Sequence, residues 1–168
     1  PVPKVLKAKA GSDYLLDENR IYETVKSVVE NVKKPVTVKI RIGWDHNHIN
    51  ALNVAKLIKK AGASAICIHG RTKTDLYAGK VNYDIIRQIK EDLKDFPVIA
   101  NGDITTPQLA KEVLTKTGCD AVMIGRGSYG NPYLFKQINH FLKTDELLPN
   151  LSIESKIDIL LNYAKDLI

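Results

Sequence analysis

The sequence predicts an α/β protein with a parallel sheet of about four βα units, half the number in a TIM (β/α)8 barrel. Short apolar runs at 36–42, 65–69, 97–100 and 121–124 alternate with segments of helical periodicity. This alternating order is typical of parallel strands joined by helices. Each run is also followed by a polar segment that contains glycine, at the position where the loops of such a barrel hold ligands.

Composition and cysteine content are those of a soluble globular domain. The chain has 168 residues, of which 44% are hydrophobic and 26% charged, and this length suffices for one domain with a real core. No apolar run approaches the length of a membrane span, and the first residues lack the apolar middle of a signal peptide, so we expect a cytoplasmic protein without a membrane partner. Cys67 and Cys119 lie in or beside predicted strands and are expected to be core residues without a disulfide.

Basic residues outnumber acidic ones, with 25 Lys plus Arg against 19 Asp plus Glu and a net charge of +6. Lys4, Lys7 and Lys9 crowd the segment 1–12, which has no helical or strand periodicity and is expected to be a loop. Such a segment is either a solvated basic loop or a contact for phosphate groups.

The first predicted helix and strand follow this loop. Residues 17–33 show helical spacing, with Asp17 as the expected N-cap. Residues 36–42 alternate as a strand does, which puts Lys39 and Arg41 on the same face. In a closed barrel one face points to the lumen, so the two side chains point inward together or outward together, and an inward Lys needs an anionic or electron-rich partner. The alternative is a solvated sheet edge.

The loop 43–50 contains two histidines, His46 and His48, in an H-x-H pair. We do not expect a metal site there, because the sequence places no third ligand beside them. Asn50 is a candidate N-cap for the next predicted helix, 51–61, which is followed by glycine.

The strand 65–69 delivers His69 to the end of the sheet that receives the other polar turns. A histidine at this position is either a hydrogen-bonded core residue or a ligand contact, and the Gly and Arg that follow it favour the contact. Residues 73–83 are predicted to form a longer loop over the barrel mouth, and 84–93 a helix.

Two glycine-bearing turns suggest a ligand that carries a phosphate group. The turn 101–103 (Asn101-Gly102-Asp103) follows one strand, and the turn 125–127 (Gly-Arg-Gly) follows the next. The two glycines of the second turn let backbone N–H groups approach an anion, and Arg126 adds a forked cationic donor. Two ordinary βα turns are the alternative.

The C-terminal part contains two further predicted helices. Pro132 stands at the expected first position of a helix that continues over 133–142. A polar linker, 144–150, leads to a helix over 152–168, for which Ser152 and Ser155 are candidate caps.

The apolar face of this last helix has no evident partner in the preceding sequence. We therefore expect residues 1–143 to form a partial barrel, and 144–168 to be a linker and the first helix of a second, helical domain. A half-barrel has two strand edges with unpaired backbone groups, so we expect it to pair with other sequence or with a second copy of the chain.

Five segments in this order resemble the tRNA-dihydrouridine synthases, which are FMN-dependent enzymes with a TIM barrel. The resemblance covers about residues 1–142. The matching segments are KVLKAKAGS (Lys4–Ser12), PVTVKIRIGW (Pro35–Trp44), IHGRT (Ile68–Thr72), PVIANGDI (Pro97–Ile104) and MIGRGSYGNPYLF (Met123–Phe135).

The resemblance implies a cofactor, a substrate and a set of site residues. FMN would be held by Lys39, His69, Asn101, Gly102, Asp103, Gly125 and Arg126, with the last two at its phosphate. In this family NADPH reduces the flavin, the flavin gives hydride to the C5–C6 bond of a uridine in tRNA, and a loop cysteine supplies a proton. The tRNA contacts expected in this chain are Lys4, Lys7, Lys9 and Arg71.

The chain departs from the family pattern in two respects. The catalytic cysteine of the family stands in a G-C-P sequence immediately before the stretch that matches Pro1, and neither Cys67 nor Cys119 takes its position. The early barrel strands and nearly all of the helical domain are not represented either. We therefore expect a fragment, the C-terminal half of the barrel, that is inactive by itself.

Two alternatives remain open on sequence grounds. Another FMN-dependent barrel that acts on a free metabolite, such as a dihydroorotate-dehydrogenase-like enzyme, would explain the phosphate turn but not the basic segment or the added helix. A non-catalytic barrel fragment is the other alternative.

Overall fold

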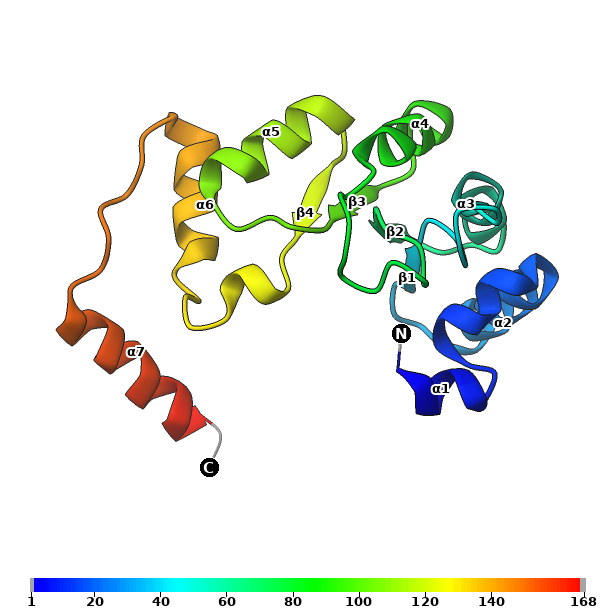
Figure 1. Cartoon of the computed structure of the whole chain (residues 1–168), viewed down its shortest axis with the longest axis horizontal. Coiled ribbons are helices and arrows are strands. Elements are labelled where there is room, and N and C mark those ends of the chain that lie inside the picture. Colours follow the sequence, from blue (N-terminus) through cyan, green and yellow to red (C-terminus); the bar gives the residue numbers. More distant parts are fainter. Residues whose placement is uncertain (1, 167–168) are drawn as a thin grey trace.

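The computed structural model describes residues 2–166 and contains one four-stranded parallel sheet with helices along one side (Figure 1). The strands lie in chain order, and each neighbouring pair is parallel. Their bounds are β1 Thr37–Arg41, β2 Ala65–His69, β3 Val98–Asn101 and β4 Ala121–Met123. The predicted α/β class with four βα units is confirmed.

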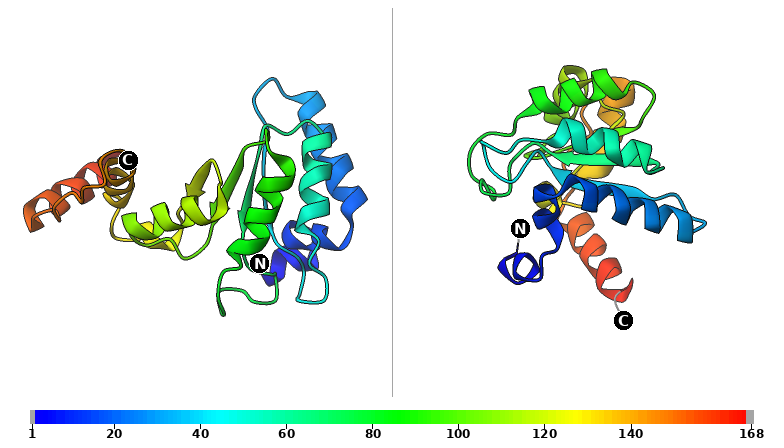
Figure 2. Two further views of the ribbon diagram at one scale, coloured as in Figure 1. Left: turned by 90° about the horizontal axis from the view of Figure 1, so that it is seen from above. Right: turned by 90° about the vertical axis from the view of Figure 1, so that its right-hand side faces the viewer.

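Helices α2 to α6 form an arc around the outer face of the sheet, as the views in Figures 1 and 2 both show. Their bounds are α2 Glu18–Asn31, α3 Ala51–Lys60, α4 Tyr83–Leu93, α5 Pro107–Thr117 and α6 Leu134–Thr144. Each helix of the arc contacts the next one along the chain. A helix between every pair of parallel strands is the arrangement expected for part of a (β/α)8 barrel.

The core lies between this arc and the outer face of the sheet. Ile66 and Ile68 of β2 and Val98 of β3 are fully buried there, since alternate residues of a strand point to the same side. The helices contribute Ile58 and Ile89, also fully buried, to the same cluster. Burial of each such side chain contributes about 1.5–3 kcal/mol, so this layer holds the strands in register.

The inner face of the sheet carries two rows of side chains, each of which contains both polar and apolar residues. One row pairs Lys39 with Cys67, which pairs in turn with Ile99. The other row, nearer the C-terminal ends of the strands, runs Arg41, His69, Asn101 and Met123. β1 and β4 are the two edge strands. Pairing of these edges with a second copy of the chain stays a prediction.

The expectation of a loop over residues 1–12 is wrong in part. A short helix, α1 (Pro3–Lys7), and a 3-10 helix, η1 (Gly11–Leu16), occupy this region. Five residues are too few to show helical periodicity in a sequence, because they make little more than one turn. A tertiary contact holds the segment in place: Arg20 of α2 donates from Nη2 to the Lys9 carbonyl oxygen at 2.8 Å.

The two expected N-caps differ in outcome. Asp17 caps α2 as predicted, accepting a hydrogen bond from the Arg20 backbone N–H at 3.0 Å. Asn50 precedes α3 but makes no side-chain cap bond. Its Nδ2 donates instead to the Leu15 carbonyl and to Glu18 Oε1. The cap prediction for Asn50 is therefore wrong, because packing of η1 and α2 against this position offers acceptors that no local pattern reveals.

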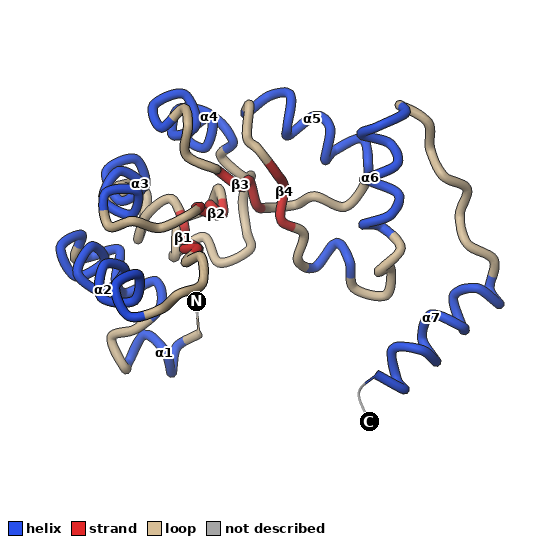
Figure 3. Tube along the Cα trace, turned by 180° about the vertical axis from the view of Figure 1, so that it is seen from behind, coloured by secondary structure: helices blue, strands red, loops and turns tan. Residues whose placement is uncertain are grey.

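The C-terminal segment leads away from the sheet (Figure 3). α6 begins at Leu134, two residues after the proline predicted to start it. α7 (Ile153–Asp166) follows an irregular segment, and Ser152, one of its two candidate caps, accepts from the Ser155 N–H at 3.2 Å. Ile153, Ile157, Leu160 and Leu161 of α7 are exposed. Its assignment to a second domain stays a prediction. Within residues 2–166, the structure contains no helix that is long and apolar enough to cross a membrane.

Candidate functional site

A cavity of about 470 Å³ lies at the C-terminal ends of the strands, which is the end of a TIM barrel that carries the chemistry. Its size is within the range of small-molecule and cofactor sites. All seven residues expected to hold the cofactor line it: Lys39, His69, Asn101, Gly102, Asp103, Gly125 and Arg126. Arg41, Tyr77, Met123 and Tyr129 are among the other lining residues. The structure thus brings together residues that are up to 87 positions apart, from 39 to 126.

β1 contributes two cations to the cavity, and they lie on one face of the strand, as the alternation predicted. Lys39 is exposed on the inner face, whereas Arg41 is 8% exposed and donates from Nη1 to the Thr72 carbonyl at 2.7 Å. Desolvation by neighbouring atoms lowers the pKa of Lys39, and the nearby Arg41 charge lowers it further, while Cys67 acts in the opposite direction. Arg41 was not among the expected site residues, although its place beside Lys39 on the alternating strand was the signal for it.

His69 ends β2 and is 7% exposed. Burial lowers its pKa from 6.5 to about 4, and the positive charges of Arg41, Lys39 and Arg71 act in the same direction. The imidazole is therefore neutral at physiological pH, and one ring nitrogen can donate while the other accepts.

The turn after β3 brings backbone and carboxylate groups to the cavity. Gly102 has φ +134° and Asp103 has φ +44°, both in the region that L side chains rarely adopt. A Cβ at position 102 would also lie 2.7 Å from a methyl carbon of Val81 and 3.2 Å from the His69 ring, so only glycine fits. Asn101 donates from Nδ2 to the Met123 carbonyl at 2.8 Å, which ties this turn to β4.

The Gly-Arg-Gly turn after β4 presents Arg126 to the same cavity. A Cβ at Gly125 would meet nothing within 4 Å, whereas one at Gly127 would collide with the Ile104 carbonyl oxygen. The Arg126 guanidinium lies 4.2 Å from the centre of the Tyr77 ring, and its Nη2 is 3.7 Å from Asp103 Oδ1. Sequence reasoning missed Tyr77. The available signal was an aromatic residue in the loop expected over the barrel mouth.

Arg71 is buried and is not among the residues that line the cavity. The side chain is 3% exposed and makes a forked ion pair with Asp103, at 2.8 Å from Nη1 to Oδ1 and 2.5 Å from Nη2 to Oδ2. This burial does not suit the expected contact with tRNA phosphates, because the guanidinium is already enclosed by protein acceptors. Lys4, Lys7 and Lys9 are exposed on and after α1, where they do not line the cavity.

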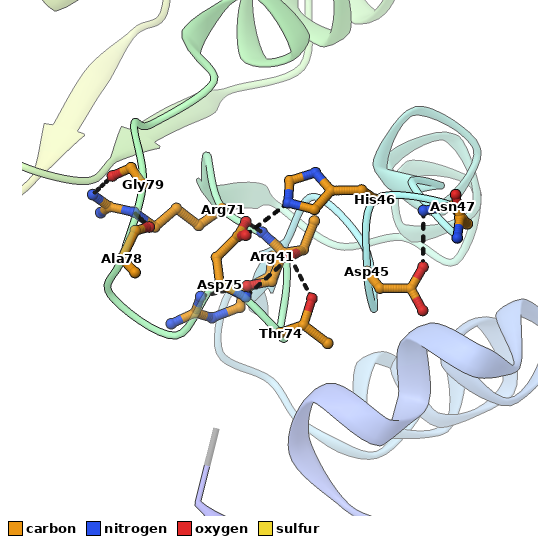
Figure 4. Close-up of polar contacts among 10 residues, drawn as sticks. Arg41, Asp45, His46, Asn47, Arg71, Thr74, Asp75, Ala78 and Gly79 are labelled. Atoms are coloured by element: carbon orange, nitrogen blue, oxygen red, sulfur yellow. Dashed lines mark hydrogen bonds and ion pairs between the residues drawn. The ribbon is translucent and has the colours of Figure 1, made fainter.

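The loop after β2 is anchored on both sides, as Figure 4 shows. Asp75 accepts from the Thr72 N–H at 2.8 Å and from His46 at 2.8 Å. His48 lies 2.7 Å from Asp45, so both histidines of the H-x-H pair contact carboxylates in the structure. Within the described residues 2–166, no group of three or more His, Cys, Asp or Glu is arranged to hold a metal ion. Cys67 and Cys119 are buried and free, as predicted.

Charge sets the chemistry that this cavity can perform. Lys39, Arg41 and Arg126 supply positive charge from two sides, and Asp103 is the sole carboxylate among the described lining residues. That carboxylate is already paired with Arg71, which lowers its pKa through a side-chain hydrogen bond. Three cations against one shared carboxylate leave the cavity with an excess of positive charge, so the site fits a ligand that carries negative charge.

Comparison with known proteins shows the family of this chain. The family model described as "Dihydrouridine synthase (Dus)" matches residues 1–168. A probable tRNA-dihydrouridine synthase of Rickettsia bellii is 44% identical over 168 residues, which are 100% of this chain and 51% of the relative. A tRNA-dihydrouridine synthase B of Pseudomonas putida is 46% identical over 163 residues, covering 97% of this chain and 48% of the relative.

A solved structure supports the fold alone. The crystal structure of 2,3-dimethylmalate lyase, a PEP mutase/isocitrate lyase superfamily member, superposes with a TM-score of 0.52 at 13% identity, covering 90% of this chain and 54% of that one. The chain spans about half the length of the curated relatives it matches. The family match extends over every residue of the chain, and the chain therefore belongs to the dihydrouridine synthase family.

Proposed function

We propose that this chain is the flavin-binding part of an enzyme that reduces the C5–C6 bond of a uridine in tRNA to give dihydrouridine. The observation that carries the proposal is the convergence of Lys39, Arg41 and Arg126 on one cavity whose carboxylate is already neutralised by a buried arginine. Such a cavity suits an anionic cofactor, and membership of the dihydrouridine synthase family makes FMN the natural candidate.

The residues present fit FMN. Arg126 would hold the phosphate through forked, charge-assisted hydrogen bonds. Gly125 leaves open space at this turn, since a Cβ there would meet nothing within 4 Å. When bound, FMN would supply hydride chemistry for the reduction of the uridine, with NADPH as the source of electrons.

The other side chains would bind and orient groups in the cavity. Lys39 supplies a cation on the inner face, which stabilises negative charge that develops on a bound ring. His69 is neutral and can donate one hydrogen bond. Asn101 uses one amide hydrogen on Met123 and keeps its amide oxygen and its second N–H for a ligand.

The tRNA substrate would require a basic surface and an extruded base. A uridine within a folded RNA must leave its stack before its ring can reach the cavity. Lys4, Lys7 and Lys9 form an exposed basic segment, and we propose that they contact the RNA backbone, as the net charge of +6 favours. A tRNA substrate also implies a cytoplasmic protein.

For the 168-residue chain alone we expect no turnover. The inner face of the sheet is open between the edge strands β1 and β4, so water reaches the row that carries Lys39. Electrostatic stabilisation is strongest where water is excluded, and this face does not provide that by itself.

The test is formation of dihydrouridine by the whole protein that carries this chain. Purified protein is incubated with FMN, NADPH and tRNA from a strain that lacks dihydrouridine, and the nucleosides are analysed by mass spectrometry. We expect a uridine that has gained two hydrogens, and strong loss of this product in Lys39→Ala but not in Arg87→Ala on the outer helix α4. The proposal fails if the wild-type protein binds flavin yet converts no uridine. Oxidation of a free pyrimidine by the same preparation would instead favour a metabolite enzyme.

A further inference from the structure

Arg71 joins three separate segments around the cavity through one buried guanidinium. Nε donates to the Ala78 carbonyl at 2.9 Å and Nη2 to the Gly79 carbonyl at 2.6 Å, both in the loop after β2 (Figure 4). The two terminal nitrogens also bind the Asp103 carboxylate in the turn after β3. Nη1 lies 3.5 Å from Nε2 of His69 at the end of β2.

These contacts use the full capacity of an arginine. A guanidinium has five N–H groups in a fixed planar fork, and here each has an acceptor: two carbonyls, two carboxylate oxygens and one imidazole nitrogen. Lysine has three donors and no planar fork, so it cannot satisfy the same set. Because an unpaired buried charge is costly, the positions of all three segments are coupled to this one group.

The contact to His69 determines which imidazole nitrogen can donate. A guanidinium can only donate, so Nε2 of His69 must accept, and the proton of the neutral ring then sits on Nδ1. At neutral pH the ring is neutral, because burial and nearby cations lower the pKa of His69 to about 4. The Nδ1–H is thereby available to a group bound in the cavity that His69 lines.

The contact to Asp103 holds a turn that is unfavourable by itself. Gly102 and Asp103 both have positive φ, and a non-glycine residue such as Asp103 keeps this unfavourable conformation only where its surroundings hold it. Arg71 provides the fork on Asp103, and Tyr83 donates to the Gly102 carbonyl at 2.5 Å. The same carboxylate faces Arg126 at 3.7 Å, so the position of Arg71 also bears on the far wall of the cavity.

We propose that Arg71 is a positioning residue for the cavity: it holds the loop that carries Tyr77 and the turn that carries Asp103, and it fixes His69 as a donor through Nδ1. This role deepens the proposed function, since the group that His69 meets would be the bound flavin. Arg71 itself does not line the cavity, so it acts through its three partners.

The experiment uses the whole protein without flavin, labelled with 15N on histidine, with the His69 signals assigned through His69→Gln. The variants are Arg71→Met, which keeps the length of the side chain and removes every donor, and Arg71→Lys. Asp103→Asn is a third variant that leaves Arg71 intact. Arg87→Met is the matched control, because Arg87 is an exposed arginine paired with Glu91 at 2.8 Å on α4.

We expect the wild type, Asp103→Asn and the control to show a protonated Nδ1 and an unprotonated Nε2 at neutral pH. In Arg71→Met a large share of His69 should carry its proton on Nε2, and amide exchange at residues 76–80 should speed up while that of α4 stays unchanged. For both measurements, Arg71→Lys should give values between those of the wild type and those of Arg71→Met. With FMN added, the dissociation constant should rise about tenfold in Arg71→Met.

Wild-type 15N shifts and wild-type loop exchange in Arg71→Met would overturn the proposal. If that variant does not fold, Arg71→Lys decides the matter by the same two measurements. Neither measurement needs flavin, so a wild type that fails to bind FMN would contradict the proposed function and leave the role of Arg71 to be judged separately.

Discussion

The guanidinium of Arg126 lies 4.2 Å from the centre of the Tyr77 ring, although the two residues come from loops after different strands. An arginine over an aromatic face is held by attraction between its charge and the ring, and this contact orients the fork of Arg126 toward the cavity. The side chain remains 54% exposed, so it can still receive a ligand. This geometry leads to the first of four predictions.

Arg126→Ala should weaken FMN binding by about 1.5–3 kcal/mol, because the variant can no longer form a forked, charge-assisted bond to phosphate. This corresponds to roughly a tenfold or greater rise in the dissociation constant. Lysine at this position should restore only part of the affinity, since an ammonium lacks the planar fork. Flavin fluorescence titration of the whole protein measures both effects, with Arg87→Ala as the control. Unchanged affinity in Arg126→Ala would remove the phosphate assignment of this turn.

Gly127→Ala should destabilise the fold by about 1–3 kcal/mol, the usual cost of forcing an extra group into a packed site. The added Cβ would collide with the Ile104 carbonyl oxygen, which is part of the backbone and cannot swing aside. Gln88→Ala is the control, because Gln88 is an exposed residue on the outer helix α4. Urea unfolding should therefore give a clearly lower free energy of unfolding for Gly127→Ala than for the control. Equal free energies of unfolding for the two variants would show that Gly127 does not approach the Ile104 carbonyl as closely as the structure indicates.

Neutral His69 makes stability depend on pH in a defined window. The unfolded chain takes up this proton near pH 6.5 and the folded protein only near pH 4, so the folded state loses stability as the pH falls between these values. The free energy of unfolding should fall by up to about 1.4 kcal/mol per pH unit there, and this contribution should be constant above that window.

The measurement for this prediction is urea unfolding across the window for wild type and His69→Gln. Other groups titrate in the same range, so the difference between the two proteins is the quantity that reports on His69. The stability of the wild type relative to His69→Gln should fall steadily as the pH drops from 6.5 to 4. Parallel curves for wild type and His69→Gln would contradict a depressed pKa.

Replacing both Lys7 and Lys9 by Gln should weaken tRNA binding and reduce its salt dependence, while FMN affinity stays unchanged. For each lysine that binds a phosphate group, its removal should lower the slope of log affinity against log salt by about 0.7–0.9. Lys33→Gln with Lys34→Gln is the matched control, because both are exposed and precede β1, at the opposite end of the strand from the cavity. tRNA binding at two salt concentrations tests the prediction. An equal reduction of affinity in the control pair would show that only net charge matters.

The sequence by itself determined the order of elements and most of the cavity wall. Alternation in 36–42 placed Lys39 and Arg41 on one face, and glycine on both sides of Arg126 marked a turn with room for an anion. These signals are local, since strand alternation and the φ freedom of glycine depend on neighbouring residues alone. α1 was missed because five residues leave no periodic trace.

Only the tertiary structure decided what Arg71, Asp103 and Tyr77 do. Arg71 meets Asp103 across 32 residues because the strand register sets His69 opposite Asn101 and so brings the two following turns together. The same stacking of strand ends places Tyr77 on Arg126. Register comes from the packing of buried side chains across the whole sheet, and no stretch of sequence contains that information. For this reason Arg71 was expected to reach outward to RNA, whereas the fold buries its charge against a carboxylate from the neighbouring strand.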